Sequence, residues 1–498
     1  MATKVFGALA SFFLLASVAV IIAVAVIQTY KITYSSPGLK YGIVLDCGSS
    51  RTTVYVYDWP AEKENNTGVI NQTLRCLVKG PGISDFGKNV TQDQETWKSF
   101  QSCMVQVQGK IPASQHNTTS IYLGATAGMR LLQLQNEAIS NRIMQNMSDY
   151  LQSSPFDFQN ASIISGEESG LYGWITVNYL MNNFLEKGLW NSWVRPHGAQ
   201  TVGSLDLGGA STQIAFTTDE GARGPGLTKV TLYGYDYTVY THSFLCFGKN
   251  EAEITVLAKL VQSSADSLNV VHPCYPAGFN TTMTEEFIFG SECTRDLRLV
   301  GYSPKRNITI SGGGDVIECR KAVRSIFDFA SCGGFQNCSF NGVDQPPVSG
   351  EFMAYAGFYW TAWALRLVGS SSLEEFNSTM WNFCSMNWQD LKKNYTITEK
   401  HLKSYCYSAN YVLTILVDGY KFDDQSWNDI RFEKQVKRTS IAWTLGFMLT
   451  LSNMIPAEPK LVNLPMENGV FAGVLFLFSA LTIVMLVFLI ILLIRTCY

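Results

Sequence analysis

The sequence has little charge of either sign for its length, and neither sign dominates. Its 498 residues include 37 lysines and arginines against 40 aspartates and glutamates, a formal net charge of −3. A protein that binds nucleic acid through its phosphates carries a basic surface, which this balance does not provide. We therefore expect no nucleic acid among the partners. The length exceeds what one ordinary hydrophobic core supports, which favours two domains or lobes.

Charge is absent from one long apolar segment near each end of the chain. Residues 6–28 are 23 uncharged residues, and residues 470–494 are 25 more, followed by Arg495. Both exceed the ~20 residues that a helix needs to cross a bilayer. A cleaved signal peptide is the alternative for the first segment, but its apolar run exceeds the usual ~7–15 residues and no small-residue cleavage site follows. We expect two transmembrane helices in a lipid bilayer, with residues 1–5 and 495–498 in the cytoplasm.

The twelve cysteines contain no C-x-x-C pair, so the spacing typical of structural zinc sites is missing. Besides Cys47, ten cysteines lie between the apolar segments, together with eleven Asn-x-Ser/Thr sequons. This combination indicates a disulfide-bonded, glycosylated body in an oxidising compartment. Cys497 is either lipidated or free. The sequon asparagines are Asn65, Asn71, Asn89, Asn117, Asn146, Asn160, Asn280, Asn307, Asn337, Asn377 and Asn394.

Two stretches of this body repeat one pattern at a distance of 160 residues. "YGIVLDCGSSRTTVYVYDW" begins at Tyr41, and "TVGSLDLGGASTQIAF" begins at Thr201. Each predicts a strand that ends in aspartate, a tight turn of small residues, and a second strand. Such turns direct backbone N–H groups and hydroxyls inward and form a concave anion site. Asp46 and Asp206 are placed to hold a divalent cation, through water if it is Mg²⁺. Capping of each turn by its aspartate is the alternative, which the duplication disfavours.

The segments between the two turns supply further polar groups. "SIYLGATA" predicts a strand that carries Thr126 into the same cleft, with a helix beginning near Gly128. "ISGEESGLYG" then predicts a glycine turn with acidic residues at the start of a helix. Ser165 and Glu168 match a capping box, and Glu167 suits the helix dipole, so both glutamates have structural roles without chemistry.

This order of parts resembles that of the ecto-nucleoside triphosphate diphosphohydrolases, the cell-surface apyrases, and especially their type 3 form. It is similar, more loosely, to the actin, hexokinase and Hsp70 superfamily. The resemblance extends over the whole chain through "LGATAGMRLL", "YGWITVNY", "LDLGGASTQI", "YTHSFLCFGKNEA", "FYWTAWAL" and "IAWTLGFMLTLSNMIPAE". It implies an α/β fold of two RNase H-like lobes with a cleft between them. Lobe 1 would comprise residues 36–163, completed by residues 438–460, and lobe 2 residues 164–437.

The resemblance implies a multi-pass plasma-membrane enzyme whose extracellular body hydrolyses nucleoside tri- and diphosphates with Ca²⁺ or Mg²⁺. We also expect a homo-oligomer formed through the transmembrane helices. The implied disulfides are Cys76–Cys103, Cys246–Cys293, Cys274–Cys319, Cys332–Cys338 and Cys384–Cys406.

The resemblance further implies roles for individual residues. Asp46 and Asp206 would hold the hydrated metal, and Trp360 and Lys249 would sandwich the nucleobase. Lysine at position 249 replaces the usual arginine, so a planar stacking partner is lost. Without the resemblance, Trp360 fits core packing equally well and Lys249 a solvated charge. Phosphate would be bound by Ser49, Ser50, Arg51, Gly208, Gly209, Ala210 and Ser211. The attacking water would be positioned by Thr126, Ser211 and Gln213.

Position 169 departs from the family pattern at its general base. The family has glutamate immediately before the second glycine, where this chain has Ser169. Serine does not accept a proton at neutral pH, and loss of a general base costs ~10²–10⁴-fold in rate. Glu168 is a candidate substitute, although one residue along a helix turns a side chain by ~100°. The leading expectation is an ecto-nucleotidase acting on ATP, ADP, UTP and UDP. The alternative is a catalytically impaired nucleotide-binding surface protein.

Overall fold

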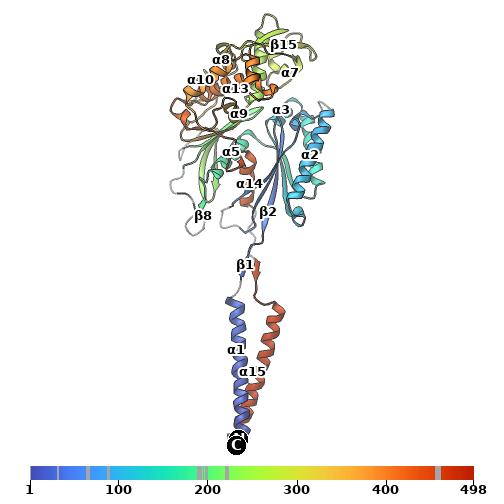
Figure 1. Ribbon diagram of the computed structural model, residues 1–498, viewed down its shortest axis with the longest axis vertical. Helices are drawn as coiled ribbons and strands as arrows, with labels where there is room; N and C mark the ends of the chain where they lie inside the picture. Colours follow the sequence, from blue (N-terminus) through green and yellow to red (C-terminus); the bar gives the residue numbers. More distant parts are fainter. Residues whose placement is uncertain are drawn as a thin grey trace. The chain divides into compact units, whose positions relative to one another are not determined.

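The computed structural model of the chain describes residues 2–30, 33–62, 68–86, 90–187, 193–194, 196, 200–218, 224–454 and 461–497 (Figure 1). The chain divides into two compact units. The terminal unit comprises Met1–Leu39, Pro60–Glu64 and Pro456–Tyr498. The body comprises Lys40–Trp59 and Asn65–Ile455.

The terminal unit contains the two predicted membrane spans as long helices, α1 (Ala2–Tyr30) and α15 (Asn468–Cys497). Both are long and apolar enough to cross a bilayer. They pack against each other, and the hydroxyls of Ser17 and Thr482 lie 2.7 Å apart within this contact. A short antiparallel pair, β1 (Thr33–Ser35) with β20 (Leu461–Asn463), belongs to the same unit.

The first sheet of the body has five strands in the order β4-β3-β2-β5-β6. Strands β3 and β4 are antiparallel, whereas β2, β5 and β6 are parallel. Buried side chains of this sheet form one hydrophobic core with those of helices α2, α3 and α4. The strands are β2 (Leu39–Cys47), β3 (Thr52–Pro60), β4 (Asn71–Leu77), β5 (Ser120–Ala125) and β6 (Asp157–Ile163). The helices are α2 (Val90–Lys110), α3 (Ala127–Gln135) and α4 (Glu137–Gln152).

The second sheet has six strands in the order β11-β12-β10-β9-β16-β17. Its last five strands repeat the order of the first sheet, with β9 and β10 in the places of β2 and β3, and β16 and β17 in the places of β5 and β6. The predicted duplicated α/β fold is therefore confirmed. The strands are β9 (Gly203–Leu207), β10 (Ser211–Thr217), β11 (Leu227–Leu232), β12 (Tyr235–Leu245), β16 (Phe352–Ala356) and β17 (Ile430–Phe432).

Helices α5 (Gly166–Leu180) and α14 (Trp443–Met454) pack against each other, and each also covers a sheet. Helix α5 lies on β9, β10 and β12. Helix α14 lies on β2 and β5, where a Cβ at Gly124 would be 2.2 Å from the Trp443 ring. The segment expected to return to lobe 1 thus contacts the first sheet, while residues 455–460 lie outside the described residues and the lobe boundaries stay a prediction.

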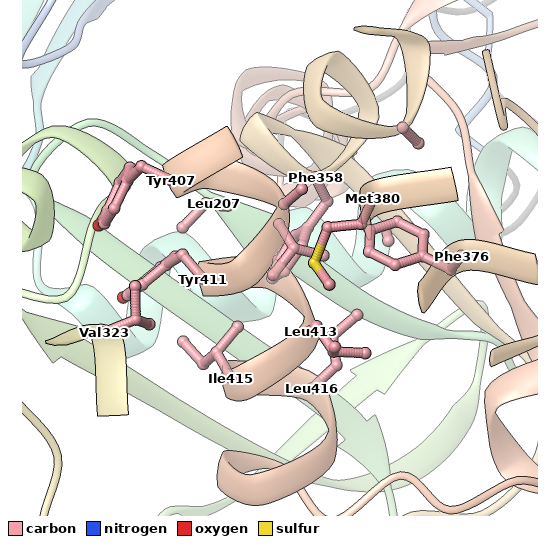
Figure 2. Packing of buried hydrophobic residues seen from close by; sticks show 14 of the residues in the cluster. Leu207, Val323, Phe358, Phe376, Met380, Tyr407, Tyr411, Leu413, Ile415 and Leu416 are labelled. Carbon is pink, nitrogen blue, oxygen red and sulfur yellow. The ribbon is translucent and has the colours of Figure 1, made fainter. Parts of the chain in front are cut away.

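The second sheet is covered by a large helical core centred on α13 (Tyr405–Thr414). Figure 2 shows Val323, Phe358 and Met380 beside Tyr411 and Leu413 of this helix. All five expected disulfides are present, and Cys47 is free and buried. Other helices of this part are α6 (Lys249–Ser263), α7 (Glu285–Phe289), α8 (Val316–Arg324), α9 (Gly357–Ala364), α10 (Leu373–Cys384), α11 (Trp388–Asn394) and α12 (Glu399–Leu402).

Three small sheets complete the part of the body that the structure describes. One has three strands in the order β13-β15-β14, and the others are the antiparallel pairs β7 with β8 and β18 with β19. The strands are β7 (Glu186–Lys187), β8 (Trp193–Val194), β13 (Asn269–His272), β14 (Asn280–Thr284), β15 (Asn307–Gly312), β18 (Gln435–Val436) and β19 (Thr439–Ser440).

Candidate active site

The two predicted turns have the same backbone geometry. In the first, which joins β2 to β3, the N–H of Gly48 donates to the carbonyl of Arg51 at 3.0 Å. In the second, which joins β9 to β10, the N–H of Gly208 donates to the carbonyl of Ser211 at 2.9 Å. Each turn follows a strand that contains the predicted aspartate. The repeat seen in the sequence is therefore a repeat of structure.

The two turns lie directly against each other. A Cβ at Gly209 would be 2.6 Å from the hydroxyl of Ser49, so a larger residue would require a shift of this side chain or of the turn. Helix α6 fixes the second turn, because its first backbone N–H groups, at Lys249 and Asn250, donate to the carbonyls of Gly208 and Gly209. The structure thus brings together the predicted phosphate-binding segments of the two sheets.

Asp46 and Asp206 are partly buried beneath these turns. Desolvation raises the pKa of Asp46, against a hydrogen bond of 2.8 Å from the Trp443 indole N–H and the charge of Arg51. Desolvation and the charge of Asp46 raise the pKa of Asp206 to about 7, again against Arg51. Two carboxylates in each other's field carry an excess of negative charge, which suits a divalent cation.

Two aspartates are the protein ligands proposed for a cation at this position. Among the residues that the structure describes, no group of three or more His, Cys, Asp or Glu side chains is gathered closely enough to ligate a metal. A cation beside Asp46 and Asp206 would therefore take its remaining ligands from water and substrate oxygens, as Mg²⁺ commonly does.

Thr126 lies at the end of β5, beside the first turn. It is the N-cap of α3, and its backbone N–H donates to the carbonyl of Cys47 at 3.1 Å. The helix expected near Gly128 begins one residue earlier, at Ala127. A Cβ at Gly128 would lie 2.7 Å from the Cα of Ser49, so the start of α3 packs closely on the first turn.

A buried network surrounds Ser211 and Gln213. The Gln213 amide donates to the hydroxyls of Ser211 at 2.5 Å and Ser243 at 2.8 Å. The guanidinium of Arg130 donates to the same two hydroxyls, at 3.4 Å each. Burial lowers the pKa of Arg130, and the charge of Glu167 opposes this shift. The network holds a positive charge and several hydroxyl groups behind the second turn.

Ser169 lies in the first turn of α5 and is buried, with 6% of its surface exposed. The predicted capping box is present: Glu168 N–H donates to the Ser165 hydroxyl at 3.1 Å, and Ser165 N–H donates to the Glu168 carboxylate at 2.9 Å. A Cβ at Gly170 would lie 3.6 Å from the Cβ of Gln213, so this turn of α5 packs on the Gln213 network. The Glu168 carboxylate is exposed and engaged in its cap.

Lys249 and Trp360 have different neighbours. The Lys249 ammonium lies 5.3 Å above the Tyr405 ring, and burial lowers its pKa. The Trp360 ring is 37% exposed and packs edge-on against Trp363, with the Lys434 ammonium at 5.8 Å. Their joint role at a nucleobase stays a prediction.

Three site residues were not assigned roles from the sequence. Arg130, Ser243 and Trp443 lie in the segments "LGATAGMRLL", "YTHSFLCFGKNEA" and "IAWTLGFMLTLSNMIPAE", so the family motifs contained them. Their contacts join segments far apart in the chain: Arg130 reaches Ser243, and Trp443 reaches Asp46. Sequence patterns over neighbouring residues do not predict contacts of this kind.

Comparison with known proteins agrees with this architecture. A model of the GDA1/CD39 (nucleoside phosphatase) family matches residues 33–464. Ectonucleoside triphosphate diphosphohydrolase 3 of Homo sapiens is 53% identical over 479 residues, which cover 96% of this chain and 90% of that protein. Ectonucleoside triphosphate diphosphohydrolase 8 of Rattus norvegicus is 44% identical, with 84% of each chain covered.

A solved structure shares the fold at low sequence identity. The crystal structure of nucleoside triphosphate hydrolases from Neospora caninum matches with a TM-score of 0.55 at 15% identity, covering 84% of this chain and 92% of that one. The family model and the two relatives each extend over more than four-fifths of the chain. The chain therefore belongs to the GDA1/CD39 (nucleoside phosphatase) family.

Proposed function

We propose that the chain is a membrane-anchored ecto-nucleotidase that hydrolyses nucleoside tri- and diphosphates, ATP, ADP, UTP and UDP among them, to lower phosphates and orthophosphate. The observation that carries this proposal is the pair of facing turns, with one aspartate preceding each. Relatives at 53% and 44% identity are named ectonucleoside triphosphate diphosphohydrolases, which supports the same chemistry here.

The turns would hold the phosphate chain between them. Backbone N–H groups and hydroxyls at Ser49, Ser50 and Ser211, with the charge of Arg51, suit phosphate oxygens. The remaining groups of the phosphate site would be Gly208, Gly209 and Ala210, whose lack of bulk permits close approach. Thr126, Ser211 and Gln213 would orient the water that attacks the terminal phosphorus while the bridging P–O bond breaks.

A divalent cation, Ca²⁺ or Mg²⁺, would be held by Asp46 and Asp206. When bound, such an ion neutralises phosphate charge. The raised pKa of Asp206, caused by desolvation and by the charge of Asp46, supports a cation as the missing counter-charge. Lys249 and Trp360 remain our candidates for contacts with the nucleobase, with the aromatic face on Trp360 supplying the stacking surface.

Serine at position 169 favours slow turnover of the nucleotide compared with a family member that has glutamate there. The side chain at this position lies on the turn of α5 that packs on the Gln213 network, and serine offers no carboxylate to take the proton of the attacking water. Glu168 is our second candidate for that proton, but its carboxylate accepts the N–H of Ser165. The alternative function, nucleotide binding with little turnover, rests on this one substitution.

Helices α1 and α15 would anchor the body at the plasma membrane with the site outside the cell. Five disulfides support an oxidising compartment for the body. A homo-oligomer formed through these helices stays a prediction.

The test is phosphate release by intact cells that express the full chain. ATP, ADP and AMP are added to the medium, with cells expressing the Asp206→Asn form as the control. We expect release from ATP and ADP, none from AMP, and only background release from the control. Release that appears only after the cells are permeabilised would refute the extracellular site.

A further inference from the structure

The first lobe has an aromatic groove that the proposed chemistry does not use. It lies between helices α2 and α4, at the end of the short 3₁₀ helix η1 (Ile83–Asp85), and has a volume of about 380 Å³. Its aromatic residues are Phe86, Trp97 of α2 and Tyr150 of α4. The Trp97 and Tyr150 rings meet edge to face across the two helices, with their centroids 4.8 Å apart, and this contact fixes the shape of the aromatic part of the groove.

One side of the groove is a face of α4, the helix that also carries Tyr150. Ile139, Arg142 and Asn146 line the groove, and their spacing of three and four residues places them on the same side of the helix. Arg142 and Asn146 are exposed at the rim, whereas Ile139 is half-buried. The groove therefore combines an apolar, aromatic floor with a cationic donor and an amide at its edge.

Asn146 is also the first residue of an Asn-Met-Ser sequon. We propose that Asn146 carries an N-linked glycan and that the first sugars of this glycan lie in the groove, stacked on Trp97 and Tyr150. In the transfer, the Asn146 Nδ2 forms a bond to C1 of the sugar, the C1–O bond to the pyrophosphate of a lipid-linked oligosaccharide breaks, and Nδ2 loses one proton. The five disulfides are consistent with passage through the compartment where such transfer occurs.

The chemistry of the groove suits a sugar. One face of a pyranose ring presents C–H groups, which pack on aromatic rings, while its edge presents hydroxyl and acetamido groups. Arg142 at the rim supplies guanidinium donors for those groups. A glycan attached to Asn146 is held at a high effective concentration, so docking does not require the loss of translational freedom that a free ligand would incur.

Other sequons of the same lobe provide an internal comparison. Asn160 is exposed on strand β6, and Asn117 is exposed in the 3₁₀ helix η2 (Ala113–Thr118). Neither lines the groove. Asn65 and Asn89 lie outside the described residues.

The experiment measures how fast each glycan is released from the folded protein. The full chain is produced in cells that build only high-mannose glycans, and it is treated in detergent with an endoglycosidase that cleaves between the first two sugars. Glycopeptide mass spectrometry then follows each occupied sequon separately. We expect release at Asn146 to be at least about 10-fold slower than at Asn160 and Asn117, and equally fast at all three after denaturation.

Two substitutions distinguish docking from other causes of slow release. Trp97→Ala removes the stacking surface and should bring the Asn146 rate close to that at Asn160. Since Trp97 also packs on Phe100, Arg142→Ala provides a second variant at an exposed position, with a smaller acceleration expected. An unmodified Asn146, or equal release rates in the folded wild-type protein, would overturn the proposal. If another protein or a lipid filled the groove, the release rates at the three sequons would be equal in the folded wild-type protein.

Discussion

Serine at position 169 is the residue on which the rate of hydrolysis should depend most. The groups proposed to bind phosphate and cation are all present, whereas position 169, our proposed place for the general base, has serine. Ser169→Glu should therefore raise kcat by ~10²-fold or more with little change in KM, because a general base acts on the transition state and not on ground-state binding. Steady-state kinetics with ATP on the two purified proteins would measure this.

The matched control is Glu168→Gln, one residue away in the same turn. Its side chain would keep the acceptor oxygen of the capping box, so we expect kcat within about 2-fold of wild type and a small loss of thermal stability. A wild-type chain that already turns over rapidly, and loses its activity in Glu168→Gln, would show that Glu168 is the base.

His272 should make the body sensitive to acid. Burial, followed by the charge of Lys403, lowers the pKa of His272 from 6.5 to about 3, and its ring stacks on Tyr275. The folded state therefore binds fewer protons than the unfolded state below pH 6.5, so stability is lost as the pH falls toward 3. Between pH 6.5 and 5 the loss from this one residue is about 2 kcal/mol.

His272→Phe keeps a stacked ring and removes the titration. The variant should be less stable at neutral pH, because the Cys274 N–H loses its acceptor, but its melting temperature should fall less between pH 7.5 and 5 than that of wild type. Equal falls in the two proteins would remove His272 as a cause of acid sensitivity.

At the scale of elements, local patterns could be predicted and distant contacts could not. The two turns, the capping box at Ser165 and the start of α3 depend on residues close in sequence, and the structure has all three. The five disulfide pairs could be predicted only through the resemblance to the family, because cysteine spacing alone does not fix their connectivity. The contacts of Arg130 with Ser243 and of Trp443 with Asp46 depend on how the chain folds back, which periodicity does not encode.

The close approach of the two turns gives a prediction at this scale. Gly209→Ala would place a Cβ 2.6 Å from the Ser49 hydroxyl and 3.2 Å from the Asn250 amide, so these two side chains, or the turn itself, must shift. A shift of ~1 Å at a reacting centre can cost ~10²-fold, so we expect at least a 10-fold loss in kcat/KM, measured as phosphate release.

Two further variants separate this contact from a general effect of alanine. Gly109→Ala lies in α2 with nothing within 4 Å of the new Cβ, and it should leave hydrolysis unchanged. Ser49→Ala alone should lower hydrolysis, because it removes a proposed phosphate ligand, and its combination with Gly209→Ala should lose less than the two single losses together, because the closest contact is relieved. Strictly additive effects in the double variant would contradict the contact between the turns.

At the scale of the whole molecule, duplication explains where the site lies. In each sheet an aspartate near the end of one strand precedes a glycine turn, and the two turns meet, so the same local pattern would supply both sides of the proposed phosphate site. Helices α5 and α14, which join the faces of the two sheets, bring Ser169 and Trp443 to it. The proposed anion site, cation pair and water-positioning groups would therefore depend on the packing of both sheets.

The most direct measurement of the central claim is cation-dependent phosphate release from ATP by the purified full chain in detergent, beside its Asp206→Asn form. We predict slow release in Ca²⁺ or Mg²⁺ that stops when the ion is chelated and falls to background in Asp206→Asn, with both proteins equally folded by thermal melting. Release that continues undiminished in chelator, or is equal in the two proteins, would contradict a nucleotidase site built on Asp46 and Asp206.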